Sequence, residues 1–351
     1  MKILICTQTV DQRDPVLGFF HRWLVEFAKH CESVLVICLR EGQHQLPGNV
    51  KVLSLGKETG KSRIKHLRRF IYYIVRNLSI YDAVFVHMNP EYVLMGRWLW
   101  KIMRKRTVLW YTHKSTTLKL RLASRMVNVI CTASPESFRL KRRNVVVTGH
   151  GIDTEIFAAP RAKPVDFMRI VTVGRISKSK GVHTMLEAAS LLPRNGVPYR
   201  FTIVGGPVTR ADERYYDELL QQIDTLHLQE FVGFAGPKDG TEIPAILARS
   251  DVFLHASDTG SLDKAMLEAM AARCVVLSSN DSAEVVLNAG HDALFVHHSD
   301  AGSFALALQR IYEMGESNRA EIGERLRREV TEHHSLTTLI EKLIWILKEN
   351  K

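Results

Sequence analysis

The sequence predicts an α/β protein with two doubly wound parallel sheets, one in each half of the chain. Short apolar and β-branched runs alternate with segments of helical periodicity along the whole length. One stretch, Ala158-Ala159-Pro160-Arg161-Ala162-Lys163-Pro164, interrupts every periodicity and is typical of an interdomain linker. The 351 residues suffice for two domains with separate cores. Because alternating strands and helices build parallel sheets, we expect ligands at the carboxyl ends of the strands.

The first half supplies its elements in a regular order. The expected strands are Ile3–Cys6, Val34–Leu39, Ala83–His87, Thr107–Tyr111, Val127–Thr132 and Val145–Val147, and the expected helices are Phe19–Lys29, Ser62–Arg76 and Tyr92–Met103.

The second half repeats the pattern. The expected strands are Ile170–Val173, Phe201–Val204, Phe231–Phe234, Val252–Leu254, Val275–Leu277 and Leu294–Val296, with helices between them and an amphipathic segment at Leu336–Leu347. We therefore expect a first domain over 1–158, a linker over 159–168 and a second domain over 169–335, with the helix at about 336–351 packing back on the first.

Composition favours a soluble enzyme of the cytoplasm. Hydrophobic residues make up 46% and charged residues 24%, which is ordinary for a globular protein. No apolar run is long enough to span a membrane, and Met1–Cys6 is too short for a signal segment. Five scattered cysteines without a CxxC pair indicate reduced thiols and argue against structural zinc.

The net charge of +11 is unevenly distributed. Residues 1–160 carry 26 Lys or Arg and 11 Asp or Glu, whereas residues 161–351 carry 22 and 26. The positive field therefore belongs to the first half. It suits nucleic acid, an anionic membrane surface or phosphorylated substrates.

A strand, a tight turn and a helix at Ile170–Ala189 predict an anion site. Gly174 permits the turn, and Arg175 and Lys180 lie between it and Gly181, where the helical periodicity begins. Free N–H groups at a helix start, the helix dipole and two cations all favour a phosphate. A solvated basic loop is the simpler interpretation of this stretch alone.

Three other features of the sequence are candidates. Gly205 and Gly206 end a strand, either to let backbone approach a ligand or to form a plain turn. Glu268 lies in an apolar helix and needs a partner, for which a structural ion pair would suffice. His113 follows a strand, as a surface or core histidine also would. The first strand-to-helix loop holds Gly18 alone, without the three-glycine dinucleotide fingerprint, so dehydrogenase chemistry gains little support.

The order and spacing of these motifs resemble the retaining, family-4-type glycosyltransferases of the GT-B fold, also called glycosyltransferase group 1. The matching stretches are Gly174-Arg175…Lys180-Gly181, Val204-Gly205-Gly206, Leu254-His255-Ala256-Ser257, Leu267-Glu268-Ala269-Met270-Ala271 and Gly149-His150-Gly151-Ile152-Asp153. The segment Thr112–Thr117 is similar to the phosphatidylinositol mannosyltransferase branch. The resemblance implies two Rossmann-like domains that face each other across a cleft, with the acceptor bound by the first.

The resemblance also implies roles for individual residues. Arg175 and Lys180 would bind the diphosphate of a nucleotide-sugar donor, Glu268 its ribose hydroxyls, and Gly18 would let the first loop approach it. His113 would lie near the transferred sugar and the acceptor. Donor contacts would also come from Gly205, Gly206, Gly260, Ser261, Leu262, Asp263 and Lys264. The chemistry would retain the anomeric configuration, with no cofactor and no metal, consistent with the lack of an Asp-x-Asp motif.

One departure from the family is prominent. Gly260 stands where the family usually has a Glu, eight positions before Glu268, and Ser261-Leu262-Asp263-Lys264 follows instead of Gly-Phe-Gly-Leu. We expect an active enzyme with an unusual preference for the donor sugar. Asp263 is either a sugar contact or the cap of the following helix.

Two alternatives to the transferase remain. A sugar-nucleotide epimerase of the same fold would need acid and base groups on both faces of the sugar, and no such pair is identifiable. A non-catalytic or nucleic-acid-binding protein would suit the basic first half, but its cations cluster on one helix without interleaved aromatic readout motifs. We therefore expect no nucleic-acid partner.

The basic helix at 61–76 predicts a peripheral membrane contact on the inner face of a membrane. Its first nine residues hold five cations, and apolar and aromatic residues follow. Such a helix can lie on an anionic bilayer, which would suit a lipid-linked acceptor. The simpler alternative is that Ile64, Leu67, Ile71 and Ile74 face the core and the cations are solvated.

Overall fold

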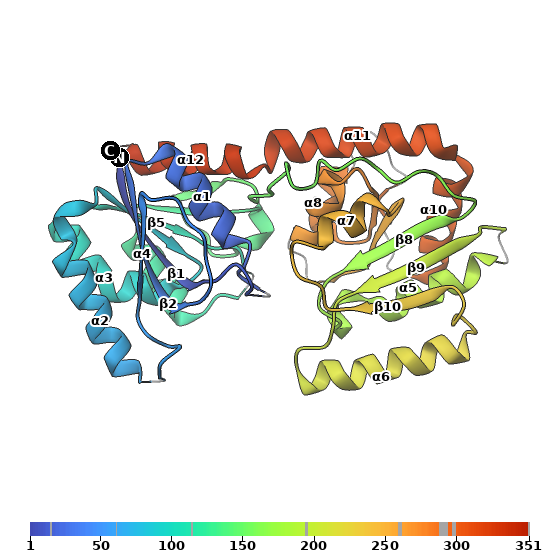
Figure 1. Cartoon of the computed structure of the whole chain (residues 1–351), viewed down its shortest axis with the longest axis horizontal. Coiled ribbons are helices and arrows are strands. Elements are labelled where there is room, and N and C mark those ends of the chain that lie inside the picture. The colour runs from blue at the N-terminus through green and yellow to red at the C-terminus, as the bar shows by residue number, and fades with distance from the viewer. Residues whose placement is uncertain are drawn as a thin grey trace. The chain divides into compact units, whose positions relative to one another are not determined.

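The computed structural model describes residues 1–14, 16–60, 62–113, 115–193, 196–258, 262–287, 294–296 and 300–349. The chain divides into two compact units, the first made of Met1–Asp153 and His334–Lys351 and the second of Thr154–His333 (Figure 1). Each unit is an α/β layer structure, as the sequence predicts.

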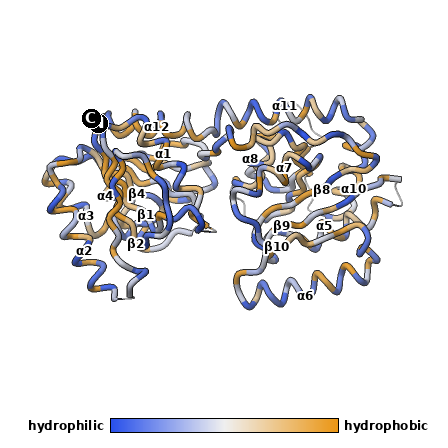
Figure 2. The backbone as a smooth tube through the Cα atoms, viewed as in Figure 1, coloured by the Kyte–Doolittle hydropathy of each residue, from blue (hydrophilic) through white to orange (hydrophobic). Residues whose placement is uncertain are grey.

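The first unit is built on a parallel sheet of seven strands among the described residues, in the order β3-β2-β1-β4-β5-β6-β7. Its strands are β1 Lys2–Val10, β2 Ser33–Glu41, β3 Val50–Ser54, β4 Ala83–His87, β5 Arg106–Trp110, β6 Val129–Thr132 and β7 Val145–Val147. The central strands are hydrophobic on both faces, because helices cover both (Figure 2).

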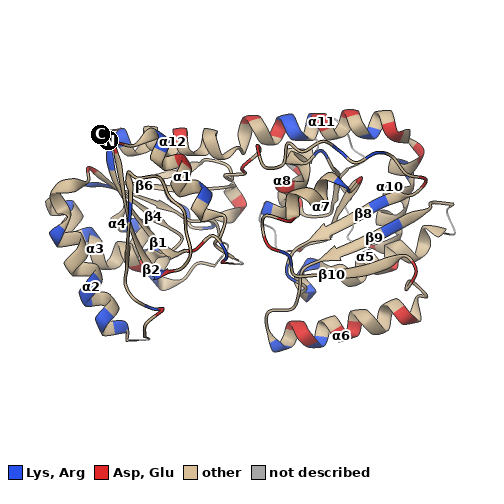
Figure 3. Ribbon diagram, in the orientation of Figure 1, with Lys and Arg blue, Asp and Glu red and all other residues tan. Residues whose placement is uncertain are grey.

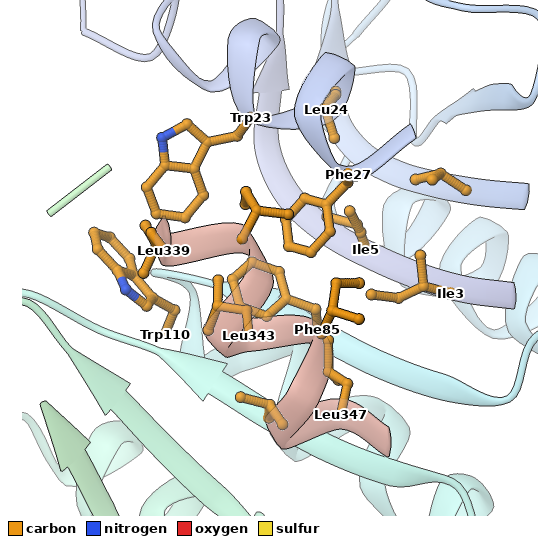
Figure 4. Close-up of a cluster of buried hydrophobic side chains, with 14 of the residues drawn as sticks. Ile3, Ile5, Trp23, Leu24, Phe27, Phe85, Trp110, Leu339, Leu343 and Leu347 are labelled. Carbon is orange, nitrogen blue, oxygen red and sulfur yellow. The ribbon is translucent and has the colours of Figure 1, made fainter. Parts of the chain in front are cut away.

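Successive side chains of β1 point to opposite faces of this sheet, and a different group of helices covers each face. Ile3 and Ile5 belong to one core cluster, with helices α1 Phe20–His30 and α12 Leu336–Lys348 (Figure 4). Leu4 and Cys6 point to the other cluster, beneath α2 Arg63–Arg76, α3 Pro90–Ile102 and α4 Leu118–Met126. The C-terminal helix therefore completes the core of the first unit, although it is the last element of the chain.

The second unit holds a parallel five-stranded sheet, again counted over the described residues, in the order β10-β9-β8-β11-β12. Its strands are β8 Met168–Val173, β9 Tyr199–Val204, β10 Val232–Gly236, β11 Val252–His255 and β12 Val275–Ser278. Its helices are α5 Val182–Leu191, α6 Arg210–Thr225, α7 Ile243–Ala248, α8 Lys264–Ala271, α9 Asp281–Leu287, α10 Ala301–Glu313 and α11 Gly315–His333.

Three elements differ from the expectation. Strand β3 and helix α4 were not predicted, since β3 is a partly exposed edge strand and α4 carries exposed leucines at positions 118 and 122. The expected strand Leu294–Val296 makes an isolated bridge, Ser278 to Phe295.

None of the helices in the described ranges combines the length and the apolar character that crossing a bilayer requires.

The chain passes between the units at Asp153 and Thr154 rather than at the expected 158. Ile152 is held in the first unit, because its N–H donates to His334 O (2.9 Å) and its carbonyl accepts from Leu336 N (2.8 Å). The expected linker is bonded to the second unit, since Arg161 pairs with Asp251 (3.1 Å). Residues 159–168 therefore belong to the second unit.

A buried histidine ends β4. His87 is 1% exposed, stacks on Phe20 (ring centroids 4.1 Å) and on Trp110 (5.4 Å), and its Nδ1 is 3.2 Å from Thr7 Oγ1. Burial lowers the pKa of His87 to about 3. The imidazole is therefore neutral in the folded unit at any pH near 7.

We predict that His87 makes the first unit less stable in acid. The unfolded state takes up a proton near pH ~6.5 and the folded state does not until about pH 3, so stability falls as pH falls between these values, by ~1.4 kcal/mol per pH unit. His87→Gln should remove this slope. Urea unfolding from pH 7.5 to 4.5, followed by tryptophan fluorescence, reports on the first unit, which contains all five tryptophans. Equal slopes for both proteins would contradict the prediction.

Candidate functional site

The second sheet has a topological switch point between β8 and β11. These strands are neighbours, and from each of them the chain continues to strands on opposite sides. In open α/β sheets, ligands bind in the crevice outside the carboxyl ends of the strands at such a point. The loop after β8 holds Gly174–Gly181, and the loop after β11 leads to Asp263 and α8. The motifs singled out in the sequence therefore converge here.

Two glycines allow the loops around this point to touch. Gly181 has φ +65°, and a Cβ there would lie 2.4 Å from Ala256 O in the loop after β11. Gly205 has φ +138°, and a Cβ there would lie 1.8 Å from Gly174 O. Any larger residue at Gly205 would push β9 away from the turn after β8. Gly205 is thus explained by the packing of two loops, whereas a Cβ at Gly206 would lie 3.5 Å from Pro237, an ordinary contact.

Asp263 is the hub of a largely buried polar network. Its Oδ2 accepts from Lys180 Nζ and lies 3.2 Å from His255 Nε2, while its Oδ1 accepts from Ala265 N (3.2 Å) and caps α8. His255 is fixed in turn by Ser278 Oγ, 2.8 Å from its Nδ1. The carboxylate joins the loop after β8, strand β11 and helix α8. The capping role expected as one alternative for Asp263 is therefore present, together with two contacts that were not expected.

The ionised form of the Asp263 carboxyl group is strongly favoured. Burial alone would raise the pKa of Asp263, but the hydrogen bond with His255 and the charge of Lys180 outweigh it and hold the pKa well below its usual range. The carboxylate is therefore ionised whenever the unit is folded near neutral pH. Lys180 has an anionic partner before any ligand arrives.

Arg175, the other predicted diphosphate residue, is more open. Its side chain is 51% exposed, and its Nε is 4.0 Å from Oδ2 of Asp212 at the start of α6. At the start of α5, the N–H of His183 already donates to Tyr215 Oη (3.1 Å). One N–H at the start of α5 is therefore already engaged, and an anion in this loop would meet chiefly the two cations.

Glu268 has the partner that its apolar helix requires. Lys264 Nζ donates to Glu268 Oε1 one turn along α8, and the Glu268 side chain is 16% exposed. Leu262, another predicted donor residue, is 5% exposed. The predicted Gly260 and Ser261 lie outside the described residues.

The two candidates of the first unit lie on loops at the carboxyl edge of its sheet. Gly18 follows β1, and a Cβ there would lie 2.7 Å from Asp14 O, so a tight turn explains this glycine. His113 follows β5 and is exposed, and its Nδ1 accepts from Ser115 N (3.0 Å). The proton of a neutral His113 is thereby placed on Nε2, which leaves a donor for a ligand.

The structure therefore assembles part of the predicted site. It joins Lys180 to Asp263 and Glu268 to Lys264, and places Gly205 and Gly206 beside the loop after β8. The sequence singles out the stretch Leu254–Ser257 but gives His255 no role, although its position at the end of a strand was a usable signal, and it does not indicate Ser278. Among the described residues, no cluster of three or more His, Cys, Asp or Glu side chains could hold a metal ion.

The comparisons with known proteins agree with this geometry. The family model of glycosyl transferases group 1 matches residues 153–329. Escherichia coli WcaL, a glycosyltransferase assigned to colanic acid biosynthesis, is 29% identical over 198 residues, which are 54% of this chain and 47% of WcaL. The lipopolysaccharide core biosynthesis glycosyltransferase LpsE of Rhizobium meliloti is 31% identical over 189 residues, 53% of this chain and 52% of LpsE.

Solved structures show the same fold over the whole chain. HepE of Anabaena in complex with UDP superposes with a TM-score of 0.78, covering 99% of both chains at 19% identity. The same protein with UDP-glucose gives a TM-score of 0.75 at 19% identity, again covering 99% of both chains. This likeness shows the GT-B fold.

The chain belongs to the glycosyl transferases group 1 family, whose model covers half of it. It spans about half the length of the curated relatives that it matches. The phosphatidylinositol mannosyltransferase branch is not specifically indicated by these relatives.

We predict that Asp263→Asn loosens the second unit at this point. The change weakens contacts to Lys180 and His255 and the cap of α8, and should lower stability by about 1–3 kcal/mol. Because the folded pKa of Asp263 is depressed, its contribution is complete above the unfolded pKa of ~3.9 and is lost only as pH falls through the lower folded value. The effect of the variant should therefore be constant from pH 7 to 5.

Hydrogen exchange of the amides of α8 measures this effect directly. The exposed Asp258→Asn in the same loop is the matched control. Unchanged protection of α8 in Asp263→Asn would show that the network is dispensable.

Proposed function

We propose that this chain is a retaining glycosyltransferase that moves a sugar from a nucleotide-diphosphate donor to an acceptor hydroxyl. The observation that carries the proposal is the pair of cations, Arg175 and Lys180, in one loop at the switch point of the second sheet. The diphosphate would bind there and Glu268 would accept from the ribose hydroxyls. The complex of HepE with UDP-glucose supports a donor of this class.

In the proposed reaction, the bond between the anomeric carbon and the diphosphate oxygen breaks while the acceptor oxygen attacks from the same face. The leaving diphosphate takes the acceptor proton, so the products are the glycoside and the protonated nucleoside diphosphate. Arg175 and Lys180 stabilise the charge that grows on the leaving oxygens. His113 would contact the sugar or the acceptor through its Nε2–H. No cofactor and no metal are part of this proposal.

Lys180 would keep its contact with Asp263 and gain a second partner in this scheme. Its ammonium group has three donors, and Asp263 occupies at least one of them. A diphosphate oxygen can take another without displacing the carboxylate. Asp263 thus orients the ammonium group toward the ligand and limits the positive charge at the site.

The epimerase of the same fold is the second candidate. It requires an acid and a base on opposite faces of the donor sugar. Of the carboxylates near the switch point, Asp263 is engaged by Lys180 and His255 and Glu268 by Lys264, so neither of these two is available as a base without losing its cation. This arrangement favours transfer over epimerisation.

The acceptor is proposed to belong to glycan synthesis in the cytoplasm, with acceptor binding by the first unit. WcaL, LpsE and the amylovoran biosynthesis glycosyltransferase AmsK all carry names from polysaccharide or lipopolysaccharide assembly. A lipid-linked acceptor would require the enzyme to meet the inner face of a membrane, and the basic segment 61–76, which contains α2, is the proposed contact. No nucleic-acid partner is proposed.

We predict that the two cations govern nucleotide affinity. Arg175→Ala or Lys180→Ala should each remove a charge-assisted contact of about 1.5–3 kcal/mol and weaken UDP binding by roughly 10- to 150-fold. Calorimetric titration with UDP, GDP and ADP measures the loss and identifies the base. The control is Lys178→Ala, an exposed cation of the same loop.

Lys180→Ala also leaves Asp263 with one cation fewer. The double variant Lys180→Ala/Asp263→Asn separates this effect, because it removes both charges together. If Arg175→Ala, Lys180→Ala and the double variant all bind nucleoside diphosphates like the parent, the diphosphate assignment is wrong.

We predict different consequences for the two ends of the Asp263–Glu268 segment. Glu268→Ala should weaken the nucleotide itself, whereas Asp263→Ala and Lys264→Ala should change which sugar is accepted. Initial rates with a panel of nucleotide sugars, read as nucleoside diphosphate release with and without acceptor, give the donor ranking. Should both loop variants keep the parent's rate and ranking, sugar selection lies elsewhere.

A further inference from the structure

One face of the first sheet is covered by a layer of three helices. Helix α3 packs against both α2 and α4, and the core beneath them includes Phe70, Tyr92 and Trp100. Helices α1 and α12 belong to the opposite face. The outer surface of the α2–α3–α4 layer is therefore a separate side of this unit, which we call the three-helix face.

Large apolar side chains are exposed on all three helices. Trp98 is 68% exposed, Ile102 75% and Leu118 73%. Others on these helices or at their ends are Ile64, Leu67, Ile71, Tyr72, Val75, Met103 and Leu122. Exposed apolar residues are common singly, but a concentration of this kind marks an interaction surface.

The exposure corrects one expectation about α2. The alternative to docking was that Ile64, Leu67, Ile71 and Ile74 face the core. Ile74 is buried, but Ile64 is 72% exposed, Leu67 44% and Ile71 39%. Three of these four apolar side chains of α2 thus remain at least partly on the surface.

The spacing of the exposed residues makes each helix contribute a continuous stripe. Trp98 and Ile102 are four residues apart on α3, as are Leu118 and Leu122 on α4, so each pair projects from one side of its helix. On α2, Ile64, Ile71 and Val75 share one side at intervals of seven and four residues.

The charge of the three-helix face indicates what kind of partner it can bind. Helices α2, α3 and α4 contain ten Lys or Arg and one acidic residue, Glu91. Cations appear on α2 and α3 in Figure 3. Glu91 is paired with Lys119 (2.9 Å). The three-helix face therefore combines exposed apolar groups with a large excess of positive charge.

We propose that the whole three-helix face docks on an anionic lipid bilayer, with Trp98 and Ile102 of α3 in the interfacial layer and α2 and α4 at its sides. This extends the contact proposed for α2 to two further helices. Membrane interfaces accept aromatic and aliphatic side chains while their anionic head groups attract Lys and Arg. A second copy of this face would oppose like charges, and a nucleic acid would leave Ile102 and Leu118 unburied.

The experiment compares two tryptophans of similar exposure on opposite faces. Trp98 is 68% exposed on α3, and Trp345 is 64% exposed on α12. Full-length protein is mixed with vesicles of brominated phosphatidylcholine and phosphatidylglycerol at low salt. Trp345→Phe, which keeps Trp98, should be quenched like the parent. Trp98→Phe, which keeps Trp345, should bind but lose most of the quenching. Quenching that depends on Trp345 would overturn the proposal.

Sedimentation with the same vesicles separates the contributions of the helices. Trp98→Ser/Ile102→Ser should reduce binding at least tenfold and leave UDP affinity unchanged, and Trp345→Ser is the matched control. Neutralising Lys65, Arg68 and Arg69 with Gln should reduce binding and its dependence on salt. If only the charge variant binds less, α2 docks alone and the proposal for the whole three-helix face is wrong. If the parent does not bind vesicles at low salt, both the contact of α2 and the docking of the three-helix face are wrong.

Two further arms test the other occupants. Stronger binding to single-stranded RNA than to vesicles, or self-association that the Trp98→Ser/Ile102→Ser variant abolishes, would overturn the proposal. The docking face is inferred independently of the proposed function, which supplies only the reason for docking, namely access to a lipid-linked acceptor. Vesicle binding without UDP affinity would refute the donor site alone, and UDP affinity without vesicle binding would refute the docking face alone.

Discussion

The second unit is organised around a buried carboxylate that must be paired. Asp263 loses hydration on burial, and an unpaired charge in such a place would be very costly. Lys180, His255 and the first amides of α8 supply the compensation. Because these groups come from three separate elements, Asp263 ties the loop after β8 to β11 and to α8. That arrangement fixes the ammonium group of Lys180 at the switch point of the sheet, where an anionic ligand would meet it.

The sequence predicts local features well and long-range pairings poorly. Apolar runs such as Ile3–Cys6 and Ile170–Val173 are buried strands because helices cover both faces of a parallel sheet. The partly exposed edge strand β3 and the short helix α4 lack this signal. Likewise, the strand–turn–helix pattern around Arg175 and Lys180 predicts an anion site from the sequence. The contact between Lys180 and Asp263 spans 83 positions, and no local pattern indicates it.

Arg273 lies between α8 and β12 and has φ +65°, a conformation that costs a non-glycine residue about 1–2 kcal/mol. Its side chain pairs with Glu324 of α11, and its carbonyl accepts from Arg161 (2.8 Å). Gly323 lets α11 approach, since a Cβ there would lie 2.3 Å from Arg273 O. Contacts to the segment after Asp153 and to α11 thus offset the backbone strain.

The cations near the candidate site of the second unit are paired with carboxylates, whereas those of the first unit are mostly in excess. The two units would therefore suit different kinds of anion. In the second unit, Arg175 faces Asp212, Lys180 contacts Asp263 and Lys264 contacts Glu268, so each site cation has a carboxylate beside it. A diphosphate bound there, as we propose, would need short directed hydrogen bonds, because the net field is weak. The first unit has few carboxylates to balance its cations. Its field acts over a Debye length, about 10 Å at 0.1 M salt, and suits an extended anionic surface better than a small ligand.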